Sequence, residues 1–385
     1  MKTKRKKYIF LTLFLFIIFL FNNSFAIALN KNKVKSILDK EEPEKKEITI
    51  TATGDMMYHD TQLFHAFNGE TYDFSNTLDP MKEYIDRSDL MLANFETTVN
   101  PDVFYQGYPT FNSPPEVLDY AKKLGFDAFS ISNNHALDLG KDGIRSTMRE
   151  MQKRNIDYFG GSLKKNSKPL IKNVKGIKVA LLSYSSIFNT GYPEDEPYLI
   201  DNLDRDKVRK DIKYAKKHSD VVVCYTHWGN EYETRANYYQ KEKAKELSDL
   251  GVDLIFGSHP HVPQECEWIN GKNGNKTFVI YSMGNLMSGQ TPLNGMAIET
   301  EYGVFVEAKI KKENGKTKIE KINLIPTYNH HAYDENNMLY GEVFATKDCL
   351  ENGKYYNKID DYSKQRAYNA SINEENILTD SYKYK

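Results

Sequence analysis

The chain contains little cysteine, with only Cys224, Cys266 and Cys349 in a length of 385 residues. Three thiols are too few for a disulfide framework, and none has a second cysteine at the short spacing of a zinc finger. Cys224 lies in the apolar run 221–225 and is expected to be a small buried side chain. A bond between Cys266 and Cys349 stays open. A chain of this length can instead bury a sizeable core, in two domains or in one large unit.

An excess of basic residues is also absent. Lys and Arg number 52 against 53 Asp and Glu, and five of the basic residues come before residue 8. The remainder carries 47 basic and 53 acidic side chains, a net charge of −6. Because binding to nucleic acid draws on a basic face, this balance argues against nucleic acid as the main partner.

An uncharged apolar run, residues 8–21, follows the basic N-terminal cluster directly. This arrangement is typical of a secretory signal, and we expect the chain to be exported. Ser24-Phe25-Ala26 and Ala26-Ile27-Ala28 both fit a cleavage site, whereas residues 8–29 can just span a bilayer, which takes about 20 residues. Segment 1–29 is therefore predicted to be a signal or a retained anchor, with a buried core helix as the alternative. The expected location is the cell membrane with the domain outside the cytoplasm, or secretion after cleavage.

Residues 30–47 are mostly charged or polar and predict a solvated linker. The folded domain is predicted over 48–335, followed by a polar C-terminal extension, 336–385, with a surface helix and a frayed tail. Within the domain, short β-rich runs alternate with amphipathic segments, which indicates an α/β fold. The expected strands are 48–53, 90–93, 128–132, 179–184, 221–225, 254–256 and 278–281, and the expected helices are 116–123, 141–154, 204–217 and 240–250. A late β-hairpin is predicted from 304–310 and 318–322 around Glu313-Asn314-Gly315-Lys316.

Nearly every predicted strand runs directly into a motif made of metal-ligand residue types. In open α/β sheets, ligands bind beyond the carboxyl ends of the strands, so these motifs are expected to converge on one rim. The motifs are Gly54-Asp55, Asn94-Phe95-Glu96, Asn133-Asn134-His135, His227-Trp228-Gly229, Gly257-Ser258-His259-Pro260-His261 and Ser282-Met283-Gly284-Asn285.

Three histidines are the first candidates for metal ligands. His259 and His261 flank a proline and can present both imidazoles from a rigid turn. A turn-and-packing role is the alternative for this pair. His227 follows a predicted strand, although a lone histidine beside a tryptophan is often a hydrogen-bonded core residue.

Asp55, Glu96 and Asn134 complete the predicted ligand set. Each of them alone also fits a turn or a helix cap. Taken with the three imidazoles, their oxygens can hold two metals a few Å apart, an arrangement that activates water and clamps a phosphoryl group. The sequence therefore predicts a divalent metal site.

His135 is predicted to act at the substrate rather than on the metal. Asp138, three residues later, can orient its ring, so that His135 contacts a substrate oxygen or protonates a leaving group. In the alternative interpretation, Asp138 caps the next helix and His135 packs. His59, four residues after Asp55, is a reserve ligand. Four further histidines lack the strand-end setting: His65, His218, His330 and His331.

The ordered motifs resemble the CapA family, named for a poly-γ-glutamate capsule biosynthesis protein, whose domain is similar to the calcineurin-like metallophosphoesterases. The resemblance runs from residue 48 to about residue 286. The matching stretches are Gly54-Asp55-Met56-Met57, Ala93-Asn94-Phe95-Glu96, Ser132-Asn133-Asn134-His135 with Asp138 and Gly140, His227-Trp228-Gly229-Asn230-Glu231-Tyr232, Gly257-Ser258-His259-Pro260-His261-Val262 with Gln264, and Tyr281-Ser282-Met283-Gly284-Asn285.

This resemblance implies a sandwich of two mixed β-sheets flanked by helices, behind an N-terminal membrane anchor. It implies divalent metal, with manganese, zinc or iron as candidates, and work with a membrane ligase and transporter-like subunits that make and export an anionic polymer. Met57 stands where the phosphoesterase pattern has a histidine, and Glu96 where an aspartate would bridge the metals, so one metal site is expected to be weakened or rebuilt. Within these motifs we expect the substrate pocket to include Asn94, Glu231, Gln264 and Asn285.

Three functions remain open from the sequence. The leading hypothesis is an extracytoplasmic component of poly-γ-glutamate capsule synthesis with a divalent metal site. The second is a metal-dependent phosphoesterase acting on a cell-surface phosphate ester. The third is a non-catalytic scaffold of the polymer-synthesis complex.

Overall fold

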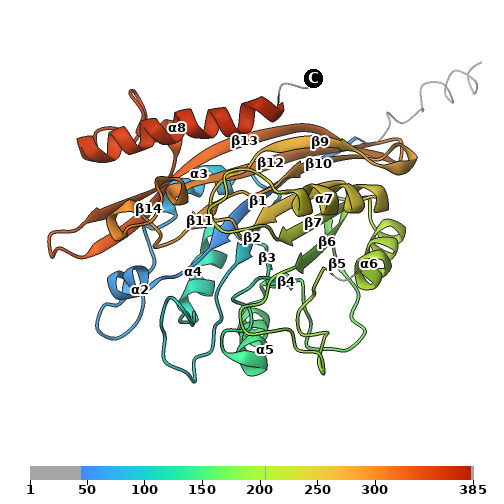
Figure 1. Cartoon of the computed structure of the whole chain (residues 1–385), viewed down its shortest axis with the longest axis horizontal. Coiled ribbons are helices and arrows are strands. Elements are labelled where there is room, and N and C mark those ends of the chain that lie inside the picture. The colour runs from blue at the N-terminus through green and yellow to red at the C-terminus, as the bar shows by residue number, and fades with distance from the viewer. Residues whose placement is uncertain (1–44, 204, 383–385) are drawn as a thin grey trace, which may run out of the picture. The chain divides into compact units, whose positions relative to one another are not determined.

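A computed structural model describes residues 45–203 and 205–382, and a compact unit begins at Lys46 (Figure 1). The predicted signal or anchor and nearly all of the predicted linker lie outside the described residues. Within the described ranges, no helix is both long and apolar enough to cross a membrane.

The larger of two mixed sheets has eight strands in the order β14-β13-β12-β1-β2-β3-β4, with β11 paired to the end of β1. Its central strand, β1 (Lys46–Met56), runs parallel to β2 and antiparallel to β12. The remaining strands are β2 (Leu90–Phe95), β3 (Ala128–Ser130), β4 (Asp157–Phe159), β11 (Asn285–Met287), β12 (Tyr302–Glu313), β13 (Lys316–Tyr333) and β14 (Leu339–Ala345).

The smaller sheet has six strands in the order β5-β6-β7-β8-β10-β9. Its inner strands β6, β7, β8 and β10 are parallel neighbours, and the two edge strands are antiparallel. The strands are β5 (Leu170–Val174), β6 (Ile177–Ser185), β7 (Val221–His227), β8 (Leu254–Ser258), β9 (Cys266–Asn270) and β10 (Lys276–Ile280).

The two sheets pack face to face because alternate residues of each strand point to opposite sides. In β7, Val221 and Val223 face the core between the sheets, whereas Val222 and Cys224 face the outer core. All three cysteines are buried free thiols, as predicted for Cys224, and Cys266 is not bonded to Cys349.

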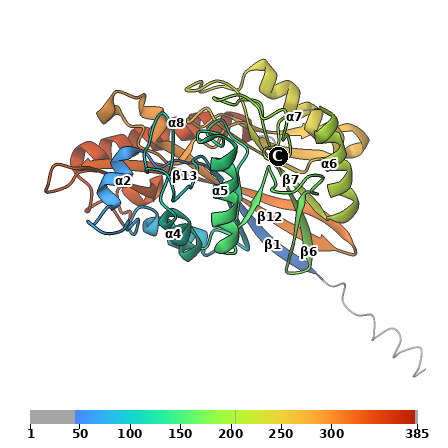
Figure 2. The same cartoon turned by 90° about the horizontal axis from the view of Figure 1, so that it is seen from below.

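Helices cover the outer face of each sheet. The larger sheet packs against α4 (Glu116–Leu124) and α5 (Gly140–Lys153), and the smaller sheet against α6 (Arg205–His218) and α7 (Tyr238–Leu250). Figure 2 shows these two pairs as separate groups. Shorter helical segments are α2 (Asp60–Ala66), α3 (Lys82–Ile85) and five 3-10 turns at Asp79–Met81, Lys272–Gly274, Pro292–Asn294, Ile298–Glu301 and Thr346–Cys349. The α/β class and the two mixed sheets flanked by helices therefore agree with the prediction.

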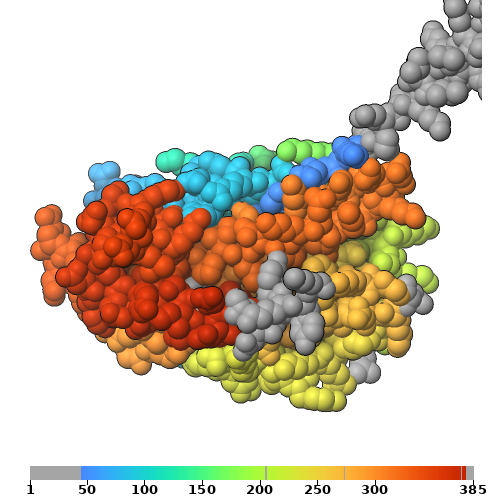
Figure 3. Space-filling view, turned by 90° about the horizontal axis from the view of Figure 1, so that it is seen from above, coloured from blue at the N-terminus to red at the C-terminus, as the bar shows by residue number. Residues whose placement is uncertain are grey.

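The C-terminal segment belongs to the same compact unit. Helix α8 (Asp361–Tyr382) lies against β13, and Figure 3 shows this red segment beside the orange strands. We predicted a surface helix in a polar extension, and α8 is that helix, with Arg366, Ala367 and Ala370 buried on its inner face. The predicted hairpin is confirmed, because β12 and β13 are paired around Asn314-Gly315.

Candidate metal centre

Two carboxylates lie at neighbouring strand ends of the larger sheet. Asp55 is near the end of β1 and Glu96 directly follows β2, and both side chains are fully buried. A bulge in β1 between Thr53 and Asp55 allows this approach. Gly54 is required there because a Cβ at this position would lie 1.8 Å from the carbonyl oxygen of Gly284.

Asn94 holds these two carboxylates side by side. Its Nδ2 donates to Asp55 Oδ1 at 2.8 Å and to Glu96 Oε2 at 3.0 Å. Its Oδ1 accepts a hydrogen bond from Asn133 at 3.3 Å. We predicted that Asn94 contacts substrate, but its buried bonds favour a role in positioning the carboxylates.

The smaller sheet supplies the three candidate ligand histidines. His227 ends β7, and its Nε2 lies 2.9 Å from Asn134 Oδ1 while its Nδ1 lies 2.9 Å from Ser258 Oγ. His261 Nδ1 lies 3.1 Å from Asp55 Oδ2 and 3.2 Å from the side-chain oxygen of Asn285. Both oxygens accept, so the proton of this imidazole belongs on Nδ1 and the lone pair on Nε2.

The turn that carries His259 and His261 has unusual backbone geometry. Their φ angles are 96° and 60°, in the left-handed region that residues other than glycine seldom adopt. The backbone N–H of His259 donates to Asp55 Oδ2 at 3.2 Å, which ties the turn to the first strand. Such geometry persists only where the surrounding structure fixes it, and it is common at functional sites.

The candidate ligands form two overlapping groups that share Glu96. One consists of Glu96, His259 and His261, and the other of Asp55, Glu96 and His227, with the ligand atoms of each group within 4.8 Å of one another. Asn134 joins the second group through its contact with His227. The structure thus brings together all six predicted ligands, from both sheets.

Unpartnered atoms show that these residues fit a metal. Glu96 Oε1 and His259 Nδ1 are buried without a hydrogen-bond partner. Glu96 Oε1 lies 3.7 Å from His227 Nε2 and 3.9 Å from His261 Nε2, too far for hydrogen bonds. Two ligand atoms that each lie about 2.1 Å from a shared metal ion are themselves about 3–4 Å apart, which agrees with these separations. The donor set of carboxylate, imidazole and amide groups suits manganese, zinc or iron.

Burial controls the charges of this cluster. It raises the pKa of Glu96 well above its ordinary value, with the nearby Asp55 charge adding to the effect. Burial also lowers the pKa of His227, and it lowers the pKa of His259 to about 3, where the neighbouring His261 contributes. The imidazoles of His227 and His259 are therefore neutral at pH 7, the form that binds metal.

His135 and Asp138 form the predicted pair. His135 Nδ1 lies 2.7 Å from Asp138 Oδ2, and that oxygen also accepts from the backbone N–H of Phe111 at 2.7 Å. The carboxylate therefore holds the ring proton on Nδ1, and Nε2 is the atom that takes up or releases a proton. Asn189 Nδ2 lies 3.5 Å from His135 Nε2, and Asn189 Oδ1 accepts a hydrogen bond from Asn134. Asn189 was not predicted from the sequence as a site residue, although it follows the carboxyl end of β6.

A cavity of about 370 Å³ opens beside the ligand cluster. Its lining includes the predicted Glu231 and His135, the ligand His261, and Met57, which stands where the resemblance expects a histidine. The other lining residues are His59, Tyr108, Tyr232, Gly289, Gln290, Asn294 and Met296.

Several residues that line the cavity were not predicted from the sequence. The reserve ligand, His59, is one of the lining residues and not part of the ligand cluster. His59 lies outside the ligand cluster, because its Nδ1 accepts from the backbone N–H of Gly289 at 3.0 Å. Tyr232 belongs to the motif that begins at His227, so a place at the site could have been anticipated, and its ring lies near that of His261. Tyr108 lies in an irregular loop with no strand-end signal.

Two residues predicted to bind substrate use their polar atoms within the protein. Gln264 donates to the carbonyl oxygens of Glu233 and Arg235 and accepts from Gln240. Asn285 donates to Gln290 at 3.0 Å and orients His261. Their geometry favours positioning of the loops around the cavity over contact with substrate.

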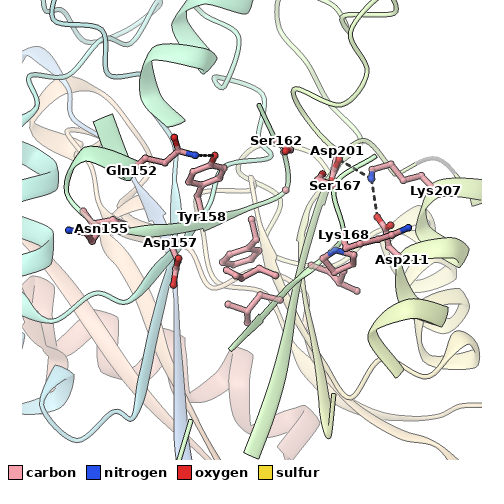
Figure 4. Close-up of a pocket in the computed structure, with 18 residues that line it drawn as sticks. Gln152, Asn155, Asp157, Tyr158, Ser162, Ser167, Lys168, Asp201, Lys207 and Asp211 are labelled. Atoms are coloured by element: carbon pink, nitrogen blue, oxygen red, sulfur yellow. Dashed lines mark hydrogen bonds and ion pairs between the residues drawn. The ribbon is translucent and has the colours of Figure 1, made fainter. Parts of the chain in front are cut away.

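A larger cavity of about 590 Å³ lies between the β4 and β5 regions, away from the predicted site residues. Figure 4 shows Lys207 at one end, 3.2 Å from Asp201 Oδ1 and 3.0 Å from Asp211 Oδ2. Burial raises the pKa of Asp201 to about 7.

Comparison with known proteins places these residues in a family. The model of the family described as bacterial capsule synthesis protein PGA_cap matches residues 49–290. The PGA biosynthesis protein CapA of Bacillus subtilis (strain 168) is 32% identical over 214 residues, which cover 53% of this chain and 54% of that protein. The capsule biosynthesis protein CapA of Bacillus anthracis is 30% identical over 262 residues, which cover 64% of this chain and 61% of that protein. The matches thus span about half to three fifths of these relatives.

Two solved structures are similar to the chain at low sequence identity. The calcineurin-like phosphoesterase YfkN from Bacillus subtilis has a TM-score of 0.41 and 15% identity, covering 74% of this chain and 91% of that chain. The 5'-nucleotidase from Candida albicans SC5314 has a TM-score of 0.40 and 11% identity, covering 88% of this chain and 60% of that chain. Because the family model matches more than half of its length, the chain belongs to the PGA_cap family of bacterial capsule synthesis proteins.

Proposed function

We propose that the chain is an extracytoplasmic component of poly-γ-glutamate capsule synthesis that works through a divalent metal centre. The observation that carries this proposal is the pair of ligand groups sharing Glu96. All ligands in both groups lie within the segment matched by the family model. The names of the relatives, a PGA biosynthesis protein and a capsule biosynthesis protein, support the process.

We infer separate tasks for the residues of the site. When bound, divalent metal polarises an oxygen of the substrate and lowers the pKa of water. Asp55, Glu96, Asn134, His227, His259 and His261 would hold the metal, and Asn94 keeps the two carboxylates in place. His135, fixed by Asp138, holds or releases a proton at Nε2 on the wall of the cavity.

We place this domain outside the cytoplasm, held at the membrane by the N-terminal apolar run. The proposed partners are a membrane ligase and transporter-like subunits, and the proposed ligand is the anionic polymer. The basic cluster followed by residues 8–21 supports the location.

Metal content and surface polymer test the proposal together. The purified chain, dialysed and measured by plasma mass spectrometry, should retain manganese, zinc or iron, and should unfold at a higher temperature with metal than without. His259→Ala should lose the part of the metal that is held with Glu96 and His261, and a strain carrying it should make less surface polymer. His218→Ala, at an exposed histidine at the end of α6, is the matched control.

Two outcomes would contradict the proposal. A wild-type chain that takes up no metal and gains no stability from it would refute the metal centre. Normal polymer export by a His259→Ala variant that has lost metal would instead favour the non-catalytic scaffold.

His135, which lines the cavity and is held by Asp138, favours a second candidate, a phosphoesterase acting on a cell-surface phosphate ester. In that case the metal-loaded chain should hydrolyse an aryl phosphate. Activity should fall in both His135→Ala and His259→Ala, and activity that persists in both variants would exclude this candidate.

A further inference from the structure

The side chains around the smaller cavity have an unusual charge pattern for a site that meets an anionic polymer. Glu231 is the only carboxylate in the lining, and no Lys or Arg is among the described residues that line it. Burial lowers the pKa of His59 to about 3, so this imidazole carries no positive charge at pH 7. The described lining therefore offers an anion no lysine or arginine partner, and the Glu231 carboxylate repels it.

The outer part of the cavity is suited to a cation. Glu231 is exposed at the rim, next to Tyr232 in the chain, and the rings of Tyr108 and Tyr232 belong to the same lining. A carboxylate attracts an ammonium group directly, and aromatic faces add a cation–π attraction. The sulfur atoms of Met57 and Met296 add polarisable surface without charge.

Tyr232 is held in a fixed position. Its backbone φ is 66°, its N–H donates to the carbonyl oxygen of Pro260 at 2.8 Å, and its hydroxyl accepts from Gln290 Nε2 at 3.3 Å. The ring lies 6.2 Å from that of His261, between centroids. The cation-attracting part of the cavity is thus directly beside the metal ligands.

A γ-linked glutamyl chain has one residue with a cationic group that matches the carboxylate and aromatic rings of the cavity. Every interior residue presents an α-carboxylate but no ammonium, because its nitrogen is in a peptide bond. The amino-terminal residue alone carries a free ammonium and a free carboxylate on the same carbon. The volume of about 370 Å³ lies at the small end of ligand pockets, which suits a terminal residue rather than a long stretch of polymer.

We propose that the cavity binds the amino-terminal residue of a γ-linked glutamyl chain, with its ammonium group against Glu231 and the rings of Tyr108 and Tyr232. This inference rests on the proposed function, because it takes the polymer from there. It adds that the site recognises the end of the polymer and does not grip its interior.

Calorimetric titration of the full chain, loaded with manganese, tests the inference with two matched probes. The first probe is a γ-linked triglutamate, and the second is the same peptide with an acetylated amino terminus. We expect acetylation to weaken binding about five- to tenfold, the sum of an exposed ion pair and a cation–π contact. Glu231→Gln should remove most of this difference and leave the metal content unchanged.

Glu233→Gln is the control, since Glu233 is an exposed neighbour bonded to Asn230 and is absent from the cavity lining. Tyr108→Leu should reduce the difference partly. Equal binding of the two peptides, or no binding of either, would overturn the inference. The proposed function is judged separately, by metal content and surface polymer, so the two can fail independently.

Discussion

Arg366 of α8 forms a buried ion pair with Glu301, behind the loop that forms one wall of the smaller cavity. Its Nε donates to Glu301 Oε2 at 2.9 Å, and its Nη2 donates to Glu301 Oε1 and to Thr291 Oγ1. His331 also contacts Glu301 and donates from Nε2 to the carbonyl oxygen of Ser288 at 2.8 Å. The C-terminal helix therefore supports the segment that carries Gly289 and Gln290.

Removal of this arginine should destabilise the protein. Arg366→Met leaves the Glu301 carboxylate buried without its cation, a change that costs about 3–5 kcal/mol. We expect a matching decrease in the free energy of unfolding in urea, and looser binding of any ligand in the cavity.

Lys364→Met provides the control on the same helix. Lys364 pairs with the exposed Asp361, and such surface pairs contribute about 0–1 kcal/mol. The double variant Arg366→Met/Glu301→Gln should be less destabilised than the two single changes added together. Additive effects would show that the two side chains do not act as a pair.

The shared position of Glu96 predicts unequal losses of metal. Glu96→Gln alters both ligand groups, so metal content should fall close to zero. His227→Ala alters only the group with Asp55 and should leave about half of the wild-type metal, held by Glu96, His259 and His261. Metal per chain after dialysis, measured by mass spectrometry, tests this.

Equal losses in Glu96→Gln and His227→Ala would contradict the assignment of two separable groups. Circular dichroism of each variant should confirm that the fold is retained. If Glu96→Gln keeps its full metal content, Glu96 is not the shared ligand.

Gly54→Ala should disrupt the approach of β1 to β11. The new Cβ would lie 1.8 Å from the carbonyl oxygen of Gly284, a distance that the backbone must relieve by moving. Because Asp55 is the next residue, we expect a loss of several kcal/mol in stability together with weaker metal binding. Urea unfolding and metal titration measure the two effects.

Gly315→Asn is a suitable comparison for this change. Gly315 has a φ of 74° with nothing within 4 Å of an added Cβ, and asparagine tolerates this conformation. A Gly54→Ala variant as stable as Gly315→Asn would show that the strand ends can separate freely.

Asp201 predicts a pH dependence of stability. Its pKa is about 7 in the folded chain against an ordinary value of 3.8, because of burial. As pH rises between these values, the unfolded chain gives up this proton first, so the free energy of unfolding falls. Asp201→Asn stays neutral and should flatten this part of the profile.

Urea unfolding at a series of pH values between 4 and 8 checks the prediction. Asp195→Asn, at an exposed carboxylate, is the control and should leave the slope in this range unchanged. Parallel profiles for wild type and Asp201→Asn would show that another group carries the dependence.

Much of the fold could be predicted because the strands are short apolar runs with clear ends. The predicted helix 116–123 is α4, and the hairpin around Asn314-Gly315 has the expected turn residues. Short edge strands such as β4, with partly polar sequence, have no comparable signal. The inner face of α8 was missed because its buried arginine looks like a surface residue in the sequence.

The gathering of the six candidate ligands could be predicted because each lies at or just beyond the end of a strand, and parallel strands end at one rim. The division of labour among the asparagines could not. Asn94, Asn134 and Asn285 have similar sequence settings, yet Asn94 bridges two carboxylates, Asn134 contacts His227 and Asn285 orients His261. These roles depend on the direction in which each side chain points. Spacing along the chain does not determine that direction.

The ligands come from both halves of the sandwich, with Asp55 and Glu96 on the larger sheet and His227, His259 and His261 on the smaller. A metal ion held between these ligands would cross-link the two sheets. Apolar packing between the sheets resists separation but offers less resistance to sliding, whereas a coordination bond resists both. Sliding of one sheet against the other would then depend on how much metal the surroundings supply. The alignment of the site residues, which come from both sheets, would depend on it as well.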